Sequence, residues 1–264
     1  PTSAMKLMDH FWPGPLTICF QKKKNVSDLV TAGLTTVCVR MPDHPKVREL
    51  LRRVGEPVAA PSANVSGRPS TTTFKDAKAQ LLKKGVFFLD GGKSPLGLES
   101  TIIDCSRKVP KLLRYGFISK EAIEKVLQQK ILDRTMSKKI SSPGQHLAHY
   151  QPKGKLTVLM GKKQDRWTWL RKNIQNKKMT LGVMEDSKHF SELRRGLGSV
   201  NLFSLATFEK DLKTYSSRLY AFLNWCDKRK AKEIILELPR IQHSLLATIL
   251  DRLKKASKGR VLRV

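Results

Sequence analysis

The segment PVAAPSANVSGRPSTTT at residues 57–73 has the composition of a loop that binds something polar. Its three prolines stiffen the backbone, while Gly67 permits the close approach of a ligand or a positive φ angle. Ser62, Asn64 and Ser70 supply short donors that lose little entropy on binding, beside backbone N–H groups that can form a nest for anionic oxygens. A solvated turn has a similar composition. The residue types alone therefore leave a phosphate-binding loop and an ordinary surface turn both open.

Two other segments carry side chains suited to anions. Arg40 ends an extended run in TTVCVRMPDHP (35–45), where an arginine can grip a carboxylate or phosphate in bidentate fashion or simply lie in solvent. The segment DGGKSPLGLES (90–100) contains GKS, but a P-loop needs a glycine at position 87, which is Phe. The remaining alternatives are a glycine turn and a loop that presents Ser100 and Thr101 to a ligand.

The chain offers no pattern for covalent or metal catalysis. Its six histidines form no HExxH motif, and the pair His146 and His149, three residues apart, is a weak metal signal. No Ser/His/Asp or Cys/His ordering is present, so we expect no catalytic nucleophile and no metal site. Four widely spaced cysteines without a CxxC pair predict buried or inert thiols of a cytoplasmic protein: Cys19, Cys38, Cys105 and Cys226.

Strand-like and helix-like segments alternate along the first half, which predicts a mixed α/β domain. We expect strands at 16–20, 35–41, 86–92, 100–106 and 110–116. We expect helices at 43–55, 73–85 and 118–129, with Thr73 and Ser119 as N-caps.

Residues 134–154, rich in Gly, Pro and Ser, have the composition of a linker. Beyond them the alternation becomes regular, with strands expected at 155–161, 179–185, 201–206 and 233–239. Helices are expected at 166–175, 189–198, 207–230 and 243–257. Strict alternation favours a smaller, doubly wound parallel α/β domain of the Rossmann-like kind. The predicted organisation is a first domain at 1–133, for which the resemblance described below implies catalysis, a linker at 134–154 and a C-terminal domain at 155–264.

The net charge is the strongest global feature of the sequence. Fifty-one Lys and Arg residues against 22 Asp and Glu residues give +29, spread along the chain. A spread excess fits an anionic substrate or a nucleic-acid partner and does not choose between them. No apolar run approaches the roughly 18 residues that span a bilayer, so we expect no membrane partner.

Several segments together, in their order and spacing, resemble the YrdC family and in particular its longer two-domain members, the threonylcarbamoyl-AMP synthases. These segments are FWPGPLT (11–17), VCVRMPDHP (37–45), APSANVSGRPS (60–70), LGLESTIIDC (96–105), LLRYG (112–116) and SPGQHLAHYQP (142–152). The resemblance implies a twisted open sheet of the YrdC type for the first domain. Family members carry a further segment before FWPGPLT, so we expect this chain to lack an N-terminal segment.

The resemblance implies a reaction of L-threonine, bicarbonate and ATP that forms threonylcarbamoyl-adenylate and pyrophosphate. It implies Mg²⁺ on the phosphates and no tightly bound cofactor. The product would pass to the tRNA threonylcarbamoyl transfer machinery, with a tRNA contact as a further expectation. Because the attacking oxygen belongs to the substrate itself, such an enzyme needs only to position two anions and offset their repulsion.

The resemblance also assigns roles to individual residues. Threonine is expected at Arg40, the Ala60 backbone and Ser100. ATP is expected at a larger set: Thr36, Ser62, Asn64, Ser70, Arg114 and, where the linker closes over the pocket, His149 and Tyr150.

Two other functions stay open at this point. A basic RNA-binding protein could use the same fold without chemistry, although aromatic residues make up only 7% and no RNA-binding motif is present. The third possible function is that of a carbamoyltransferase-type relative that makes carbamoyl-adenylate. This interpretation lacks support, because no acylphosphatase-like or zinc-finger segment accompanies the domain.

Overall fold

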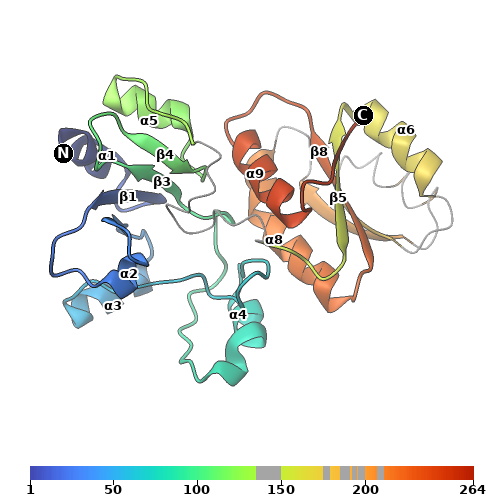
Figure 1. Cartoon of the computed structure of the whole chain (residues 1–264). Helices are drawn as coiled ribbons and strands as arrows, with labels where there is room; N and C mark the ends of the chain where they lie inside the picture. The colour runs from blue at the N-terminus through green and yellow to red at the C-terminus, as the bar shows by residue number, and fades with distance from the viewer. Residues whose placement is uncertain (135–149, 175–178, 185–190, 192–194, 196–199, 207–210) are drawn as a thin grey trace. The chain divides into compact units, whose positions relative to one another are not determined.

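Alternating apolar residues build a four-stranded mixed sheet in the N-terminal part of the chain (Figure 1). A computed structural model gives its strands as β1 (Leu16–Gln21), β2 (Thr36–Val39), β3 (Thr101–Asp104) and β4 (Lys111–Arg114), in the order β2-β1-β3-β4. β1 is parallel to β3 and antiparallel to β2, and β3 is antiparallel to β4. Four of the five predicted strands are therefore present.

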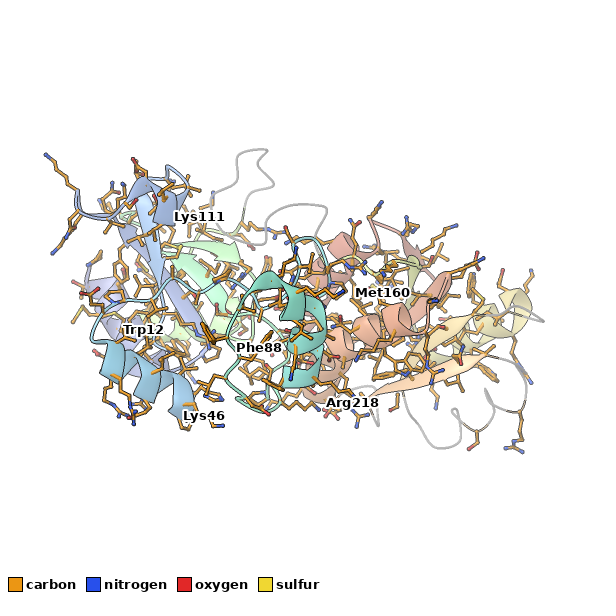
Figure 2. The ribbon with its side chains drawn as sticks, turned by 90° about the horizontal axis from the view of Figure 1, so that it is seen from below. Trp12, Lys46, Phe88, Lys111, Met160 and Arg218 are labelled. Carbon is orange, nitrogen blue, oxygen red and sulfur yellow. A yellow bond between two sulfur atoms is a disulfide. The ribbon has the colours of Figure 1, made fainter. Side chains whose placement is uncertain are left out.

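The strand predicted at residues 86–92 is wrong, because the segment has no regular secondary structure. Its apolar run predicted a buried strand, but Phe87 and Leu89 are exposed, and no described strand pairs with it. Phe88, labelled in Figure 2, instead places its ring edge-to-face on that of Phe74, with 6.1 Å between the ring centroids.

Two helices cover one face of the mixed sheet. Leu7 of α1 (Thr2–Phe11) and Ile123 of α5 (Lys120–Leu127) join Ile18 and Ile103 in one buried cluster. Helix α5 begins at Ser119, whose hydroxyl accepts from the Ala122 N–H as predicted. The sequence analysis did not predict α1.

Two further helices follow β1 and β2. The short helix α2 (Asp28–Thr31) is capped by Ser27, and α3 (Pro45–Val54) ends at Gly55, whose φ of 73° suits the left-handed C-cap. No residue of α3 is buried.

The chain divides into two compact units that do not follow chain order. The first comprises 1–61 and 98–146, and the second comprises 62–97 and 147–264. The structure describes residues 1–134, 150–174, 179–184, 191, 195, 200–206 and 211–264. Most of the predicted linker and most of the helix predicted at 189–198 lie outside these residues. The domain boundaries predicted from the sequence stay a prediction.

The second unit contains a parallel five-stranded sheet, as the regular alternation predicted. Its strands are β5 (Lys155–Gly161), β6 (Thr180–Met184), β7 (Asn201–Ala206), β8 (Glu233–Pro239) and β9 (Val261–Arg263), in the order β7-β6-β8-β5-β9. All pairings are parallel, which confirms the predicted α/β class. Strand β9, at the edge, was not predicted.

Helices pack on both faces of the parallel sheet. Leu170 of α6 (Lys163–Asn173) clusters with Leu181 and Val183 of β6. Because neighbouring strand residues face opposite sides, Gly182 turns toward Phe222 of α8 (Leu212–Lys228). A third helix, α9 (Leu246–Ala256), also contributes buried apolar side chains to this unit.

Residues 62–97 belong to the second unit although they interrupt the first in sequence. They contain α4 (Phe74–Leu81) and a single 3₁₀ turn, η1 (Leu82–Lys84). The Thr73 hydroxyl caps α4 by accepting from the Asp76 N–H, as predicted.

The cysteines differ from the sequence prediction in one respect. Cys19 and Cys38 form a disulfide, because β1 and β2 place them directly opposite each other in the antiparallel ladder. Cys105 and Cys226 are free and buried, and burial raises the pKa of both thiols, that of Cys105 to about 11. In the described part of the chain, no helix has the length and apolar character needed to cross a membrane.

Candidate active site

In the first unit, Ser100 and Arg114 meet where three strands of the mixed sheet come together. Ser100 immediately precedes β3, and Arg114 ends β4. The guanidinium of Arg114 donates to the Ser100 backbone oxygen and to its Oγ, each at 3.0 Å, and the Thr17 and Ser100 hydroxyls are 2.7 Å apart. Ser100 and Arg114 are both buried, so this hydroxyl and this cation are held in one fixed geometry.

A tight turn after β4 supports this cluster. The Thr101 hydroxyl donates to the Ile118 backbone oxygen at 2.6 Å and accepts from the Ile118 N–H at 3.0 Å. A side chain at Gly116 would come within 2.1 Å of the Thr101 nitrogen, so the motif LLRYG requires glycine there. The sequence offered Thr101 as a residue that a loop could present to a ligand, but it gave Thr17 no role, and the only signal at Thr17 is a hydroxyl in an apolar strand.

Arg40 lies beyond the end of β2 and reaches the segment FWPGP. Its Nε donates to the Gly14 oxygen at 2.8 Å, and the Gly14 N–H donates to the Met41 oxygen at 2.8 Å. Burial lowers the pKa of the Arg40 guanidinium, which still remains charged at neutral pH. Among the described residues, this Nε bond is the hydrogen bond that fixes Arg40, so its terminal nitrogens can still face an anion.

The other two predicted residues of this unit make fewer contacts. Thr36 begins β2 and is half-buried, and Ala60 lies in an exposed segment without regular structure. The first unit therefore brings Ser100 and Arg114 into direct contact, while Arg40, Thr36 and Ala60 have separate local surroundings.

The second unit contains the loop with Ser62, Asn64 and Ser70. The Asn64 amide donates to the backbone oxygens of Val65 and Arg68, at 2.9 and 3.3 Å, and folds the loop on itself. Gly67 has a φ of 79°, as expected for a position that requires glycine. Ser62 is exposed, whereas Ser70 is buried.

Two buried polar atoms of this loop have no hydrogen-bond partner among the described residues: Asn64 Oδ1 and Thr72 Oγ1. Buried polar groups are nearly always paired, and an unpaired one costs about 1–3 kcal/mol. Each such group calls for a partner, which a bound water, an ion or a ligand can supply. The two unpaired atoms are therefore consistent with a binding loop and with a solvated turn.

Tyr150 is buried in the second unit. Its ring lies 5.3 Å from that of Tyr220 in α8, and the Arg252 guanidinium lies 5.5 Å from its centroid. Tyr150 has a φ of 64°, unusual for a residue with a side chain. His149 lies outside the described residues. The roles assigned to both residues stay predictions.

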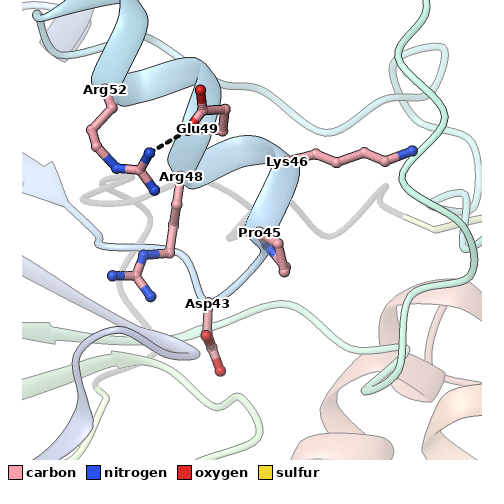
Figure 3. Close-up of a pocket in the computed structure, with 6 residues that line it drawn as sticks. All are labelled: Asp43, Pro45, Lys46, Arg48, Glu49 and Arg52. Atoms are coloured by element: carbon pink, nitrogen blue, oxygen red, sulfur yellow. Dashed lines mark hydrogen bonds and ion pairs between the residues drawn. The ribbon is translucent and has the colours of Figure 1, made fainter.

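A separate hollow of about 520 Å³ lies beside α3 in the first unit (Figure 3). Asp43, Pro45, Lys46, Arg48, Glu49 and Arg52 line it. Hydrogen bonding to Arg53 and the charge of Arg52 lower the pKa of Glu49. None of the predicted threonine or ATP residues lines this hollow, so it is not part of the candidate site.

Two family models together match nearly the whole chain. Residues 1–116 match the model described as "Telomere recombination", and residues 118–258 match the model of the threonylcarbamoyl-AMP synthase C-terminal domain. A threonylcarbamoyl-AMP synthase of Bacillus subtilis is 37% identical over the whole chain, which covers 75% of that relative. The chain belongs to the threonylcarbamoyl-AMP synthase family.

Further members of the family also align with the whole of this chain. A threonylcarbamoyl-AMP synthase of Pyrococcus abyssi is 32% identical, with all of this chain and 76% of that protein covered. The crystal structure of P. abyssi Sua5 complexed with L-threonine matches with a TM-score of 0.87 and 30% identity, over 100% of this chain and 76% of that one. A variant of the same protein, with a histidine and the adjacent tyrosine changed to alanine, matches with a TM-score of 0.85.

Proposed function

We propose that this protein is a threonylcarbamoyl-AMP synthase that converts L-threonine, bicarbonate and ATP to threonylcarbamoyl-adenylate and pyrophosphate. One observation carries the proposal: the whole chain matches the fold of a relative that was solved with L-threonine bound. The names of the relatives that align over the whole chain support the same activity.

The chemistry can proceed without a protein nucleophile. The threonine amine attacks bicarbonate, and loss of water gives a carbamate. A carbamate oxygen then forms a bond to the α-phosphorus of ATP while the bond to the β-phosphate oxygen breaks, and pyrophosphate leaves. The protein contributes orientation and fixed positive charge, which together can supply most of such an acceleration.

We assign the threonine carboxylate and hydroxyl to Arg40, the Ala60 backbone and Ser100. Arg40 keeps terminal nitrogens for a carboxylate, and the Ser100 hydroxyl is already oriented by Arg114. We assign ATP to Arg114, Thr36 and the loop with Ser62, Asn64 and Ser70, and we expect His149 and Tyr150 to act from the linker.

We propose that Mg²⁺ enters with ATP as part of the substrate. Among the described residues, no group of three or more His, Cys, Asp or Glu side chains could hold a metal ion. Magnesium commonly binds through substrate phosphates and water, with few protein ligands. Its contribution would be to neutralise phosphate charge as pyrophosphate departs.

We further propose that the enzyme works in the cytoplasm and supplies its adenylate to the machinery that transfers threonylcarbamoyl to tRNA. Because an acyl-adenylate hydrolyses readily, the next reaction must be an acyl transfer to a nucleophile, here the adenosine beside the anticodon. The net charge of +29 would favour an approach to tRNA.

Pyrophosphate release from ATP tests the function, measured with and without threonine and bicarbonate on the natural full-length protein. We expect release only when both co-substrates are present. Absence of release would refute the synthase assignment and favour the basic RNA-binding alternative. RNA affinity that falls steeply with salt would then identify backbone phosphate binding.

Single substitutions test the residue assignments. Arg40→Ala should raise the threonine KM by roughly 10-fold to 150-fold, because a charge-assisted hydrogen bond worth about 1.5–3 kcal/mol is lost. Ser62→Ala and Asn64→Ala should instead raise the ATP KM. Unchanged kinetics in both classes would refute the pocket assignment.

A further inference from the structure

Helix α8 has two faces with different tasks. Its apolar face, with Phe222, packs on the parallel sheet where Gly182 leaves no side chain in the way. Its opposite face carries polar side chains at successive turns, Ser216, Asn224 and Asp227 among them. This polar face contacts residues 62–97, the segment that contains the proposed ATP loop, all within the second unit.

Asn224 contacts the first part of the segment through both the nitrogen and the oxygen of its side-chain amide. It donates to the Ser70 backbone oxygen at 2.9 Å and to the Tyr220 oxygen at 3.0 Å, and it accepts from the Gln80 side chain at 3.1 Å. Gln80 in turn accepts from the Val65 N–H at 3.0 Å, next to Asn64. Asn224 therefore reaches the loop directly at Ser70 and, through Gln80, beside Asn64.

Asp227 joins the same loop to the last residues of the predicted linker. One carboxylate oxygen accepts from the Lys153 N–H at 2.6 Å, and the other lies 3.3 Å from the Arg68 guanidinium. The Gln151 N–H donates to the Gly67 oxygen at 3.2 Å, which adds a direct contact between the two stretches. The loop and residues 151–153 are thus held by one carboxylate.

The other end of the segment is also tied to α8. The Ser216 hydroxyl donates to the Leu96 oxygen at 3.2 Å. A side chain on Gly97 would come within 2.3 Å of the Ser217 Cα, so only glycine allows this close approach. Helix α8 consequently fixes both ends of a segment that has little regular structure of its own.

We propose that Asn224 and Asp227 are positioning residues that hold residues 62–70 in the conformation that binds ATP. The C-terminal domain then has a defined task in adenylation, which it performs without touching the nucleotide. This inference rests on the proposed function, because it assigns to α8 the geometry of that function's ATP loop.

Steady-state pyrophosphate release on the natural full-length protein tests the proposal. Asn224→Ala and Asp227→Ala should each raise the ATP KM about tenfold or more, because each leaves loop groups without their partner. The threonine KM should stay within about twofold. Asp227→Asn keeps an acceptor for the Lys153 N–H and should restore part of the ATP affinity.

Asn173→Ala is the matched control. Its amide donates to the Trp169 oxygen four residues earlier, as that of Asn224 does to Tyr220, but Asn173 is exposed on α6, and among the described residues no hydrogen bond joins it to the loop. Its ATP KM should equal that of the unmodified protein. If Asn224→Ala does not fold, Gln80→Ala removes the bonds to Val65 and to the Asn224 side chain but keeps the bond from Asn224 to Ser70, and it should raise the ATP KM more modestly.

Amide hydrogen exchange of residues 62–70 separates failure of this inference from failure of the proposed function. Faster exchange in the variants, together with a raised ATP KM, would support the proposal. Faster exchange with an unchanged ATP KM, or unchanged exchange, would overturn it. If the unmodified protein releases no pyrophosphate, the proposed function fails, and the role of α8 in ATP binding falls with it, whatever the exchange shows.

Discussion

Replacing Arg166 by methionine should destabilise the parallel-sheet unit, because it leaves a buried carboxylate without its cation. Arg166 and Glu237 each expose only 1% of their side chains, and Arg166 Nε lies 3.4 Å from Glu237 Oε1. Arg166 also donates to the Gly161 oxygen at 2.5 Å. Burial, together with the charge of Glu237, raises the pKa of the nearby Tyr215, a sign of how weakly water screens this interior.

The size of the effect follows from one-sided removal of a buried pair. Breaking such a pair by removing one partner costs about 3–5 kcal/mol. For a unit of this size, that lowers the melting temperature by roughly 6–20 °C. Tryptophan fluorescence during urea or thermal unfolding suits the measurement, because Trp167, Trp169 and Trp225 lie in this unit and only Trp12 lies in the other.

Two comparisons make this prediction specific. The double variant Arg166→Met with Glu237→Leu should recover much of the loss, because a buried pair can often be replaced by apolar groups at little cost. Arg53→Met is the control. It breaks a surface ion pair in which the Arg53 side chain is 78% exposed and that of Glu49 is 43% exposed, and it should leave the unfolding midpoint unchanged. A single variant as stable as the parent, or a double variant no better than the single, would refute the reasoning.

Three further perturbations test the structure at separate points. Thr101→Val should lower the free energy of unfolding by at least about 2 kcal/mol, because it removes the hydroxyl that bonds both the N–H and the oxygen of the Ile118 backbone. An unchanged denaturation midpoint would contradict this. Gly182→Ala should also lower the melting temperature, by an amount that depends on how far Phe222 can shift, since the new Cβ would lie 2.9 Å from its ring. Cys105, whose pKa burial raises to about 11, should react with a thiol reagent at pH 8 at least about 100-fold more slowly than an exposed cysteine, as followed by mass spectrometry. Equal rates for folded and unfolded protein would contradict that expectation.

Much of the fold followed from local pattern. The largely apolar runs at 155–161, 201–206 and 233–239 coincide with β5, β7 and β8, because the strands of a parallel sheet covered by helices are rich in apolar residues. The caps at Thr73 and Ser119 were equally readable, since a hydroxyl at an N-cap satisfies a neighbouring N–H without help from the rest of the fold. The segment at 86–92 has the same apolar character and forms no strand, because a strand also needs a partner.

The candidate binding residues and the family could be predicted before folding was considered, since residue types, glycine positions and motif order are local properties. How those residues are held became clear from the folded chain. It paired Ser100 with Arg114, joined Cys19 to Cys38 and placed residues 62–97 on α8. Such contacts link residues up to 154 positions apart, and no periodicity or composition encodes them. They follow from the strand register and helix packing of the folded chain, where burial makes each polar group find a partner.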